Sequence, residues 1–180
     1  LQAKGIDYGV AALLGGDEAL AREFEGGVFA TVYLAPFNYH RIHMPLPGTL
    51  RRARYVGGDL FSVNAATAAG VPGLFARNER IACAFDTPAG PMAVVLVGAL
   101  FVGSMSLSFA GEVTAERTRT IRDLPVTDPL VALDKGAELG RFNMGSTVVV
   151  MFGRGRVRLE PGLAAAAAVR VGQRLATILP

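Results

Sequence analysis

A glycine–serine pair, Gly145 and Ser146, stands at the start of a strongly β-forming run. Glycine tolerates strained backbone dihedrals, so a turn here can press the serine hydroxyl against the carbonyl that precedes it. Attack by that oxygen would convert the amide between the two residues into an ester, which is easier to break. The reaction needs a base for the hydroxyl proton and a hydrogen-bond donor for the oxyanion. By itself, the sequence Gly-Ser-Thr is also typical of an ordinary turn before a strand, and in isolation that simpler interpretation is favoured.

The chain holds two histidines, His40 and His43, which lie between Pro36 and Pro45. Imidazole takes up and releases protons near neutral pH, so both side chains are candidates for acid–base work. If the segment forms one helical turn, residues three apart lie on the same side of it. The alternatives are hydrogen-bonded structural histidines or a metal pair. A zinc site needs three or four ligands, and the sequence has no third histidine and no clustered cysteines, so we expect no metal.

The elements that must position these residues are predominantly strands. Segments rich in β-branched and aromatic residues alternate with glycine and proline turns. Two short helices are expected before all of these strands, at residues 8–14 and 18–24, with Asp7 and Asp17 as N-caps. The sequence predicts a mainly β (α+β) fold, a single-domain β-sandwich or barrel-like core with short N-terminal helices. The expected strands are residues 28–34, 50–56, 80–85, 93–97, 101–109, 146–152 and 157–159.

An uncharged stretch at residues 87–110 is long enough to cross a bilayer as a helix. Gly90, Gly98 and Gly103 interrupt it, and residues 104–109 alternate strictly between serine and apolar side chains. Both features favour buried strands over a membrane-spanning helix. The mean hydropathy of +0.38 is high, and peripheral contact with a membrane stays open.

Two other segments give weaker signals. Residues 114–135 are polar, contain two prolines and lack a clean period, which predicts a long surface loop. That loop either covers a site or only connects two strands. Residues 164–168 form an alanine run that is too short for more than a helical turn.

Length and composition favour one catalytic domain over residues 1–180. A chain of 180 residues with 51% hydrophobic content suits one well-buried core.

The net charge is +3, and acidic residues are interspersed with the basic ones, so there is no basic stripe and nucleic acid is not an expected partner. Cys83 is the only cysteine and lies in an apolar run, which predicts a buried structural thiol and fits a reducing compartment.

Five ordered motifs, together with the opening LQAKGIDY, resemble bacterial phosphatidylserine decarboxylases, which process themselves and depend on a pyruvoyl group. The resemblance covers nearly the whole chain, and the Gly-Ser-Thr element coincides with the processing site of that family. The five motifs are YHRIHMPLPGTL at 39–50, VGGDLFSVN at 56–64, LFARNER at 74–80, FDTPAGPMAVVLVGA at 85–99 and KGAELGRFNMGSTVVVMF at 135–152.

The resemblance implies self-cleavage between Gly145 and Ser146 through an ester, followed by β-elimination and loss of ammonia. The products would be a β chain of residues 1–145 and an α chain of residues 146–180 that begins with a pyruvoyl group made from Ser146. Phosphatidylserine would form a Schiff base with this group, lose carbon dioxide and leave as phosphatidylethanolamine. By motif, His43 would assist cleavage and His40 would handle a proton during decarboxylation.

Two positions depart from the family pattern. Met144 stands where the family usually has leucine, a change of similar volume that we expect to matter little. The family also has a processing aspartate in an Ala-Asp-Gly motif upstream of LQAKG, and that motif is absent from this sequence. Asp7 lies in a different motif and does not inherit the role. We therefore expect that an N-terminal segment carrying the aspartate precedes this chain in the complete protein.

The resemblance also implies partners and a location. We expect peripheral association with the cytoplasmic face of the bacterial inner membrane and a homo-oligomer of the α and β pair. The region of Phe37 and the loop after Thr114 are candidates for the apolar surface, and Arg41 is the candidate for binding the lipid phosphate. The alternatives are a pyruvoyl decarboxylase of another amino-acid substrate and a non-catalytic lipid-binding β-sandwich.

Overall fold

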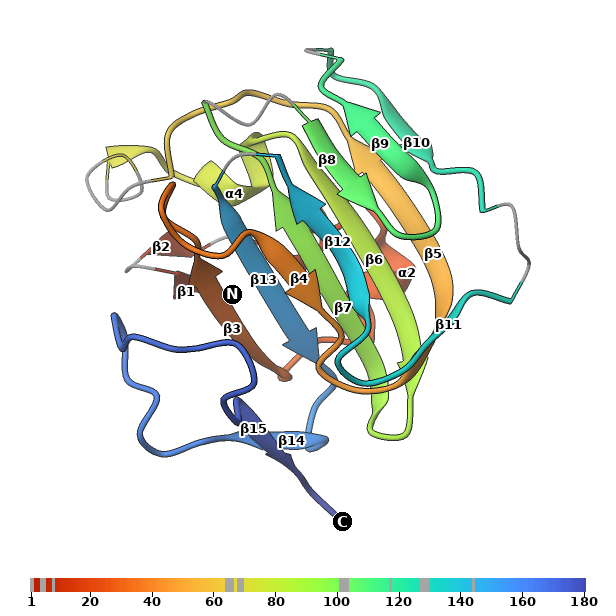
Figure 1. The fold of residues 1–180 in the computed structure, drawn as a ribbon, viewed down its shortest axis with the longest axis vertical. Coiled ribbons are helices and arrows are strands. Elements are labelled where there is room, and N and C mark those ends of the chain that lie inside the picture. The colour runs from red at the N-terminus through yellow and green to blue at the C-terminus, as the bar shows by residue number, and fades with distance from the viewer. Residues whose placement is uncertain are drawn as a thin grey trace.

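The fold is seen in a computed structural model that describes residues 2–3, 6–7, 9–63, 67, 70–100, 104–116, 118–126, 130–143 and 145–180. Most of its elements are strands, arranged in two main sheets (Figure 1). The larger sheet has the order β10-β5-β6-β7-β13-β3, with β11 also paired to β5, and all its strand pairs are antiparallel. Its strands are β3 (Val28–Tyr33), β5 (Gly48–Val56), β6 (Arg80–Thr87), β7 (Gly90–Val97), β10 (Ile121–Asp123), β11 (Ala132–Leu133) and β13 (Thr147–Phe152).

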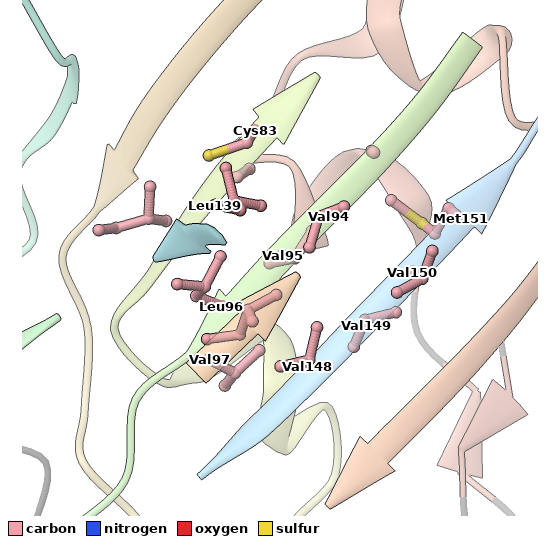
Figure 2. Close-up of a cluster of buried hydrophobic side chains, with 14 of the residues drawn as sticks. Cys83, Val94, Val95, Leu96, Val97, Leu139, Val148, Val149, Val150 and Met151 are labelled. Atoms are coloured by element: carbon pink, nitrogen blue, oxygen red, sulfur yellow. The ribbon is translucent and has the colours of Figure 1, made fainter. Parts of the chain in front are cut away.

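A smaller antiparallel sheet lies across one face of the larger one (Figure 1). Its order is β4-β12-β8-β9. Leu139 of this sheet is fully buried and joins Cys83, Val94 and Val150 of the larger sheet in one hydrophobic cluster (Figure 2). The two sheets are stacked and are not closed into a barrel, so the sandwich alternative is right and the barrel alternative is wrong. The strands of the smaller sheet are β4 (Arg41–His43), β8 (Ser104–Leu107), β9 (Gly111–Thr114) and β12 (Glu138–Phe142).

Short helices α1 (Val10–Leu13) and α2 (Glu18–Arg22) are joined to the larger sheet by buried and charged contacts. Arg80 of β6 is 3% exposed and donates to the carbonyl oxygens of Ala12 and Leu13, at 2.6 and 2.7 Å. Burial lowers the pKa of Arg80 to about 10, so it stays charged at neutral pH. These bonds hold the end of α1 against β6 and satisfy carbonyls that a helix end otherwise leaves free.

The two predicted N-caps have different outcomes. Asp17 precedes α2, and its carboxylate accepts from the Leu20 N–H at 3.0 Å, as expected for an N-cap. Asp7 instead lies in strand β2 (Ile6–Asp7), which pairs with β1 (Gln2–Ala3), and Gly9 occupies the N-cap position of α1. The Asp7 prediction is wrong because Asp7 is the second residue of a strand and the helix begins only at Val10. A further helix, α4 (Leu74–Arg77), lies in the LFARNER motif.

Most of the described part of the uncharged stretch forms strands, as predicted, and the remainder is turn or irregular chain. Residues 90–97 are β7, whose last six residues are buried, and residues 104–107 are β8; residues 101–103 lie outside the described part. Among the described residues, no helix has the length and apolarity that crossing a membrane requires. Central strands of a sheet covered on both faces are uniformly apolar, which explains the absence of charge.

The loop predicted for residues 114–135 is only partly a loop. The short strands β10 and β11 lie within it, and both pair with β5. These strands were missed because they are two and three residues long and mostly exposed, so they lack the buried alternation that marks a strand. The alanine run forms no helix, and the chain closes with β14 (Val157–Leu159) paired to β15 (Ala176–Ile178).

Candidate active site

Ser146 directly precedes β13 and is completely buried. Its carbonyl oxygen accepts from the Leu34 N–H at 2.7 Å, and its hydroxyl donates to the carbonyl oxygen of Val97. The residue is thus held from both neighbouring strands, because Leu34 follows β3 and Val97 ends β7. To attack Gly145, the Ser146 hydroxyl must leave its hydrogen bond to the Val97 carbonyl oxygen and turn toward the Gly145 carbonyl carbon.

Gly145 lies at a close backbone contact. A methyl group on its Cα would stand 2.6 Å from the carbonyl oxygen of Leu34 and 2.7 Å from Nε2 of His40. Both distances are far below normal van der Waals contact, so the position admits only glycine without displacement of its neighbours. The structure therefore brings three predicted site residues together, namely Gly145, Ser146 and His40.

Gly145→Ala is expected to slow cleavage of the peptide bond at least about tenfold, because the added methyl would press against the Leu34 carbonyl and the His40 ring and so shift the Gly145 carbonyl away from the Ser146 hydroxyl. The control is Gly162→Ala, since a Cβ at Gly162 meets no atom within 4 Å. Both variants would be followed by denaturing gel over time. Equal cleavage rates in the two variants would show that the tight fit at Gly145 does not affect the reaction.

His40 contributes a hydrogen-bond donor on the acyl side of this bond. Its Nε2 lies 2.9 Å from the carbonyl oxygen of Ala35. A carbonyl oxygen only accepts, so Nε2 of His40 carries the hydrogen. The nitrogen that would meet a Cβ at Gly145 is accordingly an N–H group, suited to donating a hydrogen bond rather than to removing a proton.

His43 lies in strand β4, at the edge of the smaller sheet, opposite Glu138 of β12, and is half-buried. The helical turn considered for this segment is wrong, because residues 41–43 are extended and positions three apart then point to opposite sides. Its contacts are with other residues: Nε2 lies 2.7 Å from the Tyr39 hydroxyl and Nδ1 lies 2.8 Å from the Gly136 carbonyl oxygen. The predicted role of His43 in cleavage stays a prediction.

A polar cluster holds the chain just before the predicted cleavage position. The Asn143 side-chain amide donates to the Ser104 hydroxyl, which in turn donates to the Glu112 carboxylate. The Asn143 N–H also donates to the Ser104 carbonyl oxygen at 3.3 Å. Sequence reasoning missed this cluster, because Ser104 was explained by the alternating pattern of its strand and Glu112 lies in no motif. The cluster anchors the acyl side of the bond to β8 and β9.

The two residues suggested for substrate binding differ in their surroundings. Phe37 is 89% exposed, at the tip of a turn closed by hydrogen bonds of 2.8 Å between Ala35 and Asn38. The same Ala35 carbonyl binds His40, so Phe37 stands close to the site in the chain and is open to solvent. Arg41 is occupied by Glu138, at 2.6 and 2.8 Å from the two carboxylate oxygens. Phosphate binding by Arg41 would have to compete with that ion pair.

The comparison with known sequences decides the family. The sequence model described as phosphatidylserine decarboxylase matches residues 1–177 of this chain. The chain belongs to the phosphatidylserine decarboxylase family. The chain is 56% identical over 174 residues to the phosphatidylserine decarboxylase proenzyme of Alcanivorax borkumensis, and 56% identical over 175 and 177 residues to those of Acidovorax ebreus and Pseudomonas aeruginosa. Each alignment covers 97% of this chain, and 60%, 62% and 61% of the respective relatives. The chain thus spans about three fifths of the length of these relatives.

Membership of this family agrees with the ordered motifs and gives the site its context. The family match includes the segments that meet at Ser146, which are β3, the turn before His40, β7 and the start of β13. The relatives are named proenzymes, that is, precursors. Met144 lies outside the described residues, so the expected neutrality of methionine at that position stays a prediction.

Other reactive groups in the described part of the chain do not form a second centre. Within residues that the structure describes, no group of three or more histidine, cysteine, aspartate or glutamate side chains is arranged to hold a metal ion. Cys83 is buried in the sandwich, and burial raises the pKa of its thiol to about 12. A thiol in this state is an inert core side chain, as the sequence predicted.

Proposed function

We propose that this chain is the catalytic part of a phosphatidylserine decarboxylase, which converts phosphatidylserine to phosphatidylethanolamine and carbon dioxide with a pyruvoyl group made from Ser146. The observation that carries the proposal is the meeting of Gly145, Ser146 and His40 in a chain 56% identical to phosphatidylserine decarboxylase proenzymes. A serine held at the end of a sheet, with a glycine carbonyl directly before it, supplies the nucleophile and the electrophile of self-cleavage.

The proposed cleavage has three stages, namely formation of an ester, elimination and release of ammonia. Ser146 Oγ loses its proton to a base and attacks the Gly145 carbonyl carbon, and the C–N bond breaks to leave an ester and a free amino group. Loss of the Ser146 α-proton then expels Gly145 as a carboxylate and leaves dehydroalanine. Addition of water and loss of ammonia convert dehydroalanine to a ketone. His43 is the proposed base, by its motif position.

The surroundings of Ser146 fit a pyruvoyl group. The group has one heavy atom fewer than the serine residue that it replaces, so the fully buried space of Ser146 accommodates it. The Leu34 N–H, at 2.7 Å from the Ser146 carbonyl oxygen, would hold the carbonyl that links the group to β13. The Cα of Ser146 would become the ketone carbon, and the ketone oxygen would replace the Ser146 nitrogen, on the side of Gly145 and therefore near His40.

In decarboxylation, the pyruvoyl ketone supplies an electrophile that accepts the electron pair left by carbon dioxide. The residues of the chain do the remaining work. By its motif position, His40 is the proposed donor of the proton that returns to the substrate carbon, and it would give up that proton from the imidazolium form, with Nε2 still bonded to Ala35. The Ala35 carbonyl fixes the His40 ring and tautomer through the 2.9 Å bond. The sandwich excludes water from the buried end of β13.

The lipid substrate requires an apolar approach to the site. Three exposed aromatic side chains, Tyr33, Phe37 and Tyr39, are 44%, 89% and 49% exposed and lie within seven residues of the chain that leads to His40. We propose that this aromatic segment contacts the bilayer, and, from the family resemblance, that the contact is peripheral and at the cytoplasmic face of the bacterial inner membrane. Aromatic side chains favour the interface between lipid and water. Homo-oligomerisation of the α and β pair stays a prediction from the family resemblance.

The two fragments are expected to remain together after cleavage. Strand β13 pairs with β3 and with β7 at all six of its residues, and those residues are buried. A break between Gly145 and Ser146 leaves these pairings intact, so the fragments should coelute in native size-exclusion chromatography and separate only in denaturant. Release of residues 146–180 under native conditions would contradict the observed central position of β13.

The activity itself is tested with purified protein and vesicles that contain phosphatidylserine. Formation of phosphatidylethanolamine, measured in lipid extracts, is the expected result. Soluble serine and phosphoserine in parallel reactions test the alternative of another amino-acid substrate. A cleaved protein that leaves phosphatidylserine unchanged and releases carbon dioxide from one of the soluble compounds would overturn the proposed substrate.

A further inference from the structure

The hydrogen bonds of the two histidines specify opposite tautomers. Nδ1 of His43 lies 2.8 Å from the Gly136 carbonyl oxygen, which only accepts, so Nδ1 carries the hydrogen. In the neutral ring, Nε2 of His43 then has the lone pair and accepts from the Tyr39 hydroxyl at 2.7 Å. His40 has the reverse arrangement, because its Nε2 must donate to Ala35.

The backbone around Gly136 fixes the position of its carbonyl. Gly136 has a φ of +83°, a conformation that favours glycine, and its N–H donates to the Met44 carbonyl oxygen at 2.9 Å. The Met44 N–H in turn donates to the Ala137 carbonyl oxygen at 2.9 Å. Two hydrogen bonds thus join this turn to the residue after His43, so the carbonyl is held in place before the imidazole binds it.

Tyr39 holds the other side of the same imidazole. Its ring is stacked on that of His43, with centroids 5.7 Å apart and planes 11° apart, in addition to the hydroxyl bond. We propose that Tyr39 is a positioning residue, which together with the Gly136 carbonyl holds His43 with Nδ1 protonated and with the lone pair of Nε2 directed at a hydroxyl donor, the state that a general base requires. The functional half of this inference rests on the proposed role of His43 in self-cleavage.

The arrangement has a chemical consequence. In a serine–histidine–carboxylate triad, the carboxylate binds the protonated Nδ1 and so leaves Nε2 as the base. Here the Gly136 carbonyl makes the same bond to Nδ1. A neutral carbonyl selects the tautomer but supplies no negative charge to stabilise an imidazolium. The Gly136 carbonyl therefore selects the tautomer that a base requires, without the negative charge of a carboxylate.

The tautomers can be measured without any cleavage. Ser146→Ala protein labelled with ¹⁵N would be examined by long-range ¹H–¹⁵N spectra at a pH where both rings are neutral. The chain has only two histidines, so a His40→Gln variant assigns both spectra. The expected result is Nδ1–H for His43 and Nε2–H for His40. Protonation of Nε2 in neutral His43 would overturn the proposal.

The function of Tyr39 is tested with Tyr39→Phe, which keeps the stacked ring and removes the hydroxyl. The Nε2 resonance of His43 should move toward that of an unbonded imidazole nitrogen, while the His40 resonances stay in place. In protein that retains Ser146, cleavage should become about fivefold slower, the scale of one net hydrogen bond. Tyr39→Ala should be slower still, because it also loses the stacking.

The matched control is Thr118→Val, which removes an exposed hydroxyl that hydrogen-bonds Thr120 at 2.9 Å. It should change neither the His43 spectrum nor the cleavage rate. An unchanged His43 spectrum and cleavage rate in Tyr39→Phe would refute the role of Tyr39. If the complete protein, with the upstream segment that is expected to carry the processing aspartate, remains uncut while the tautomers are as expected, the proposed function fails and the assignment of the histidines stands.

Discussion

Ser146→Ala is expected to remain a single uncut chain and to lose decarboxylation by at least about 1000-fold, the scale of removing a nucleophile. Alanine has no oxygen to attack the Gly145 carbonyl and cannot become a ketone. The fold should persist, because alanine fits the buried space of Ser146 and only the bond to the Val97 carbonyl is lost. Cleavage is read by denaturing gel, and activity by the conversion of phosphatidylserine.

Ser108→Ala is the matched control, since it removes an exposed hydroxyl from the turn after β8. It should be cut and active like the unsubstituted protein. A Ser146→Ala protein that is processed and decarboxylates phosphatidylserine would show that the electrophile arises at another residue.

The two histidines should separate by phenotype. If His43 is the base, His43→Ala should accumulate the precursor, with cleavage slowed about 100- to 10,000-fold, the range of general base catalysis. His40→Ala should still be cut but should turn over more slowly by a similar factor, because it loses the N–H beside Gly145. The measurements are the fraction cut over time and the rate per mole of pyruvoyl group.

The two variants change different surroundings, because His40 lies beside Gly145 whereas His43 contacts Tyr39 and Gly136. Misfolding of a variant would also reduce its cleavage and its activity, so circular dichroism and thermal unfolding should accompany each assay. A folded His40→Ala protein that stays uncut, beside a His43→Ala protein that is cut normally, would reverse the two assignments. Equal cleavage and equal activity in both variants would remove histidine from the mechanism.

The core of the fold could be predicted from the sequence because its central strands have an unambiguous composition. Strand β13 is buried at all six residues and is rich in valine, and β7 likewise has a buried run. The short strands β10 and β11 were missed because their hydrogen bonds to β5 come from the backbone and leave little trace in side-chain pattern. Strand β4 was missed because prolines and polar residues around the histidines resemble a turn.

The candidate site was predicted unequally. The family resemblance identified Gly145, Ser146 and both histidines, but no residue pattern could reveal that His40 touches Gly145 or that Tyr39 binds His43. Such contacts depend on how separate segments meet in the folded chain, as do the bonds from Asn143 to Ser104 and Glu112, which are 39 and 31 residues away along the sequence. The upstream aspartate stays a prediction from the family pattern.

The central claim is that Ser146 is converted to a pyruvoyl group, and intact mass under denaturing conditions tests it most directly. Purified, active protein should give one fragment that ends with the carboxylate of Gly145 and a second that starts at residue 146. The second should be lighter than the corresponding serine peptide by the mass of ammonia, and its N-terminus should be blocked to sequencing. A preparation that decarboxylates phosphatidylserine as one uncut chain, or with an unmodified serine at residue 146, would contradict the claim.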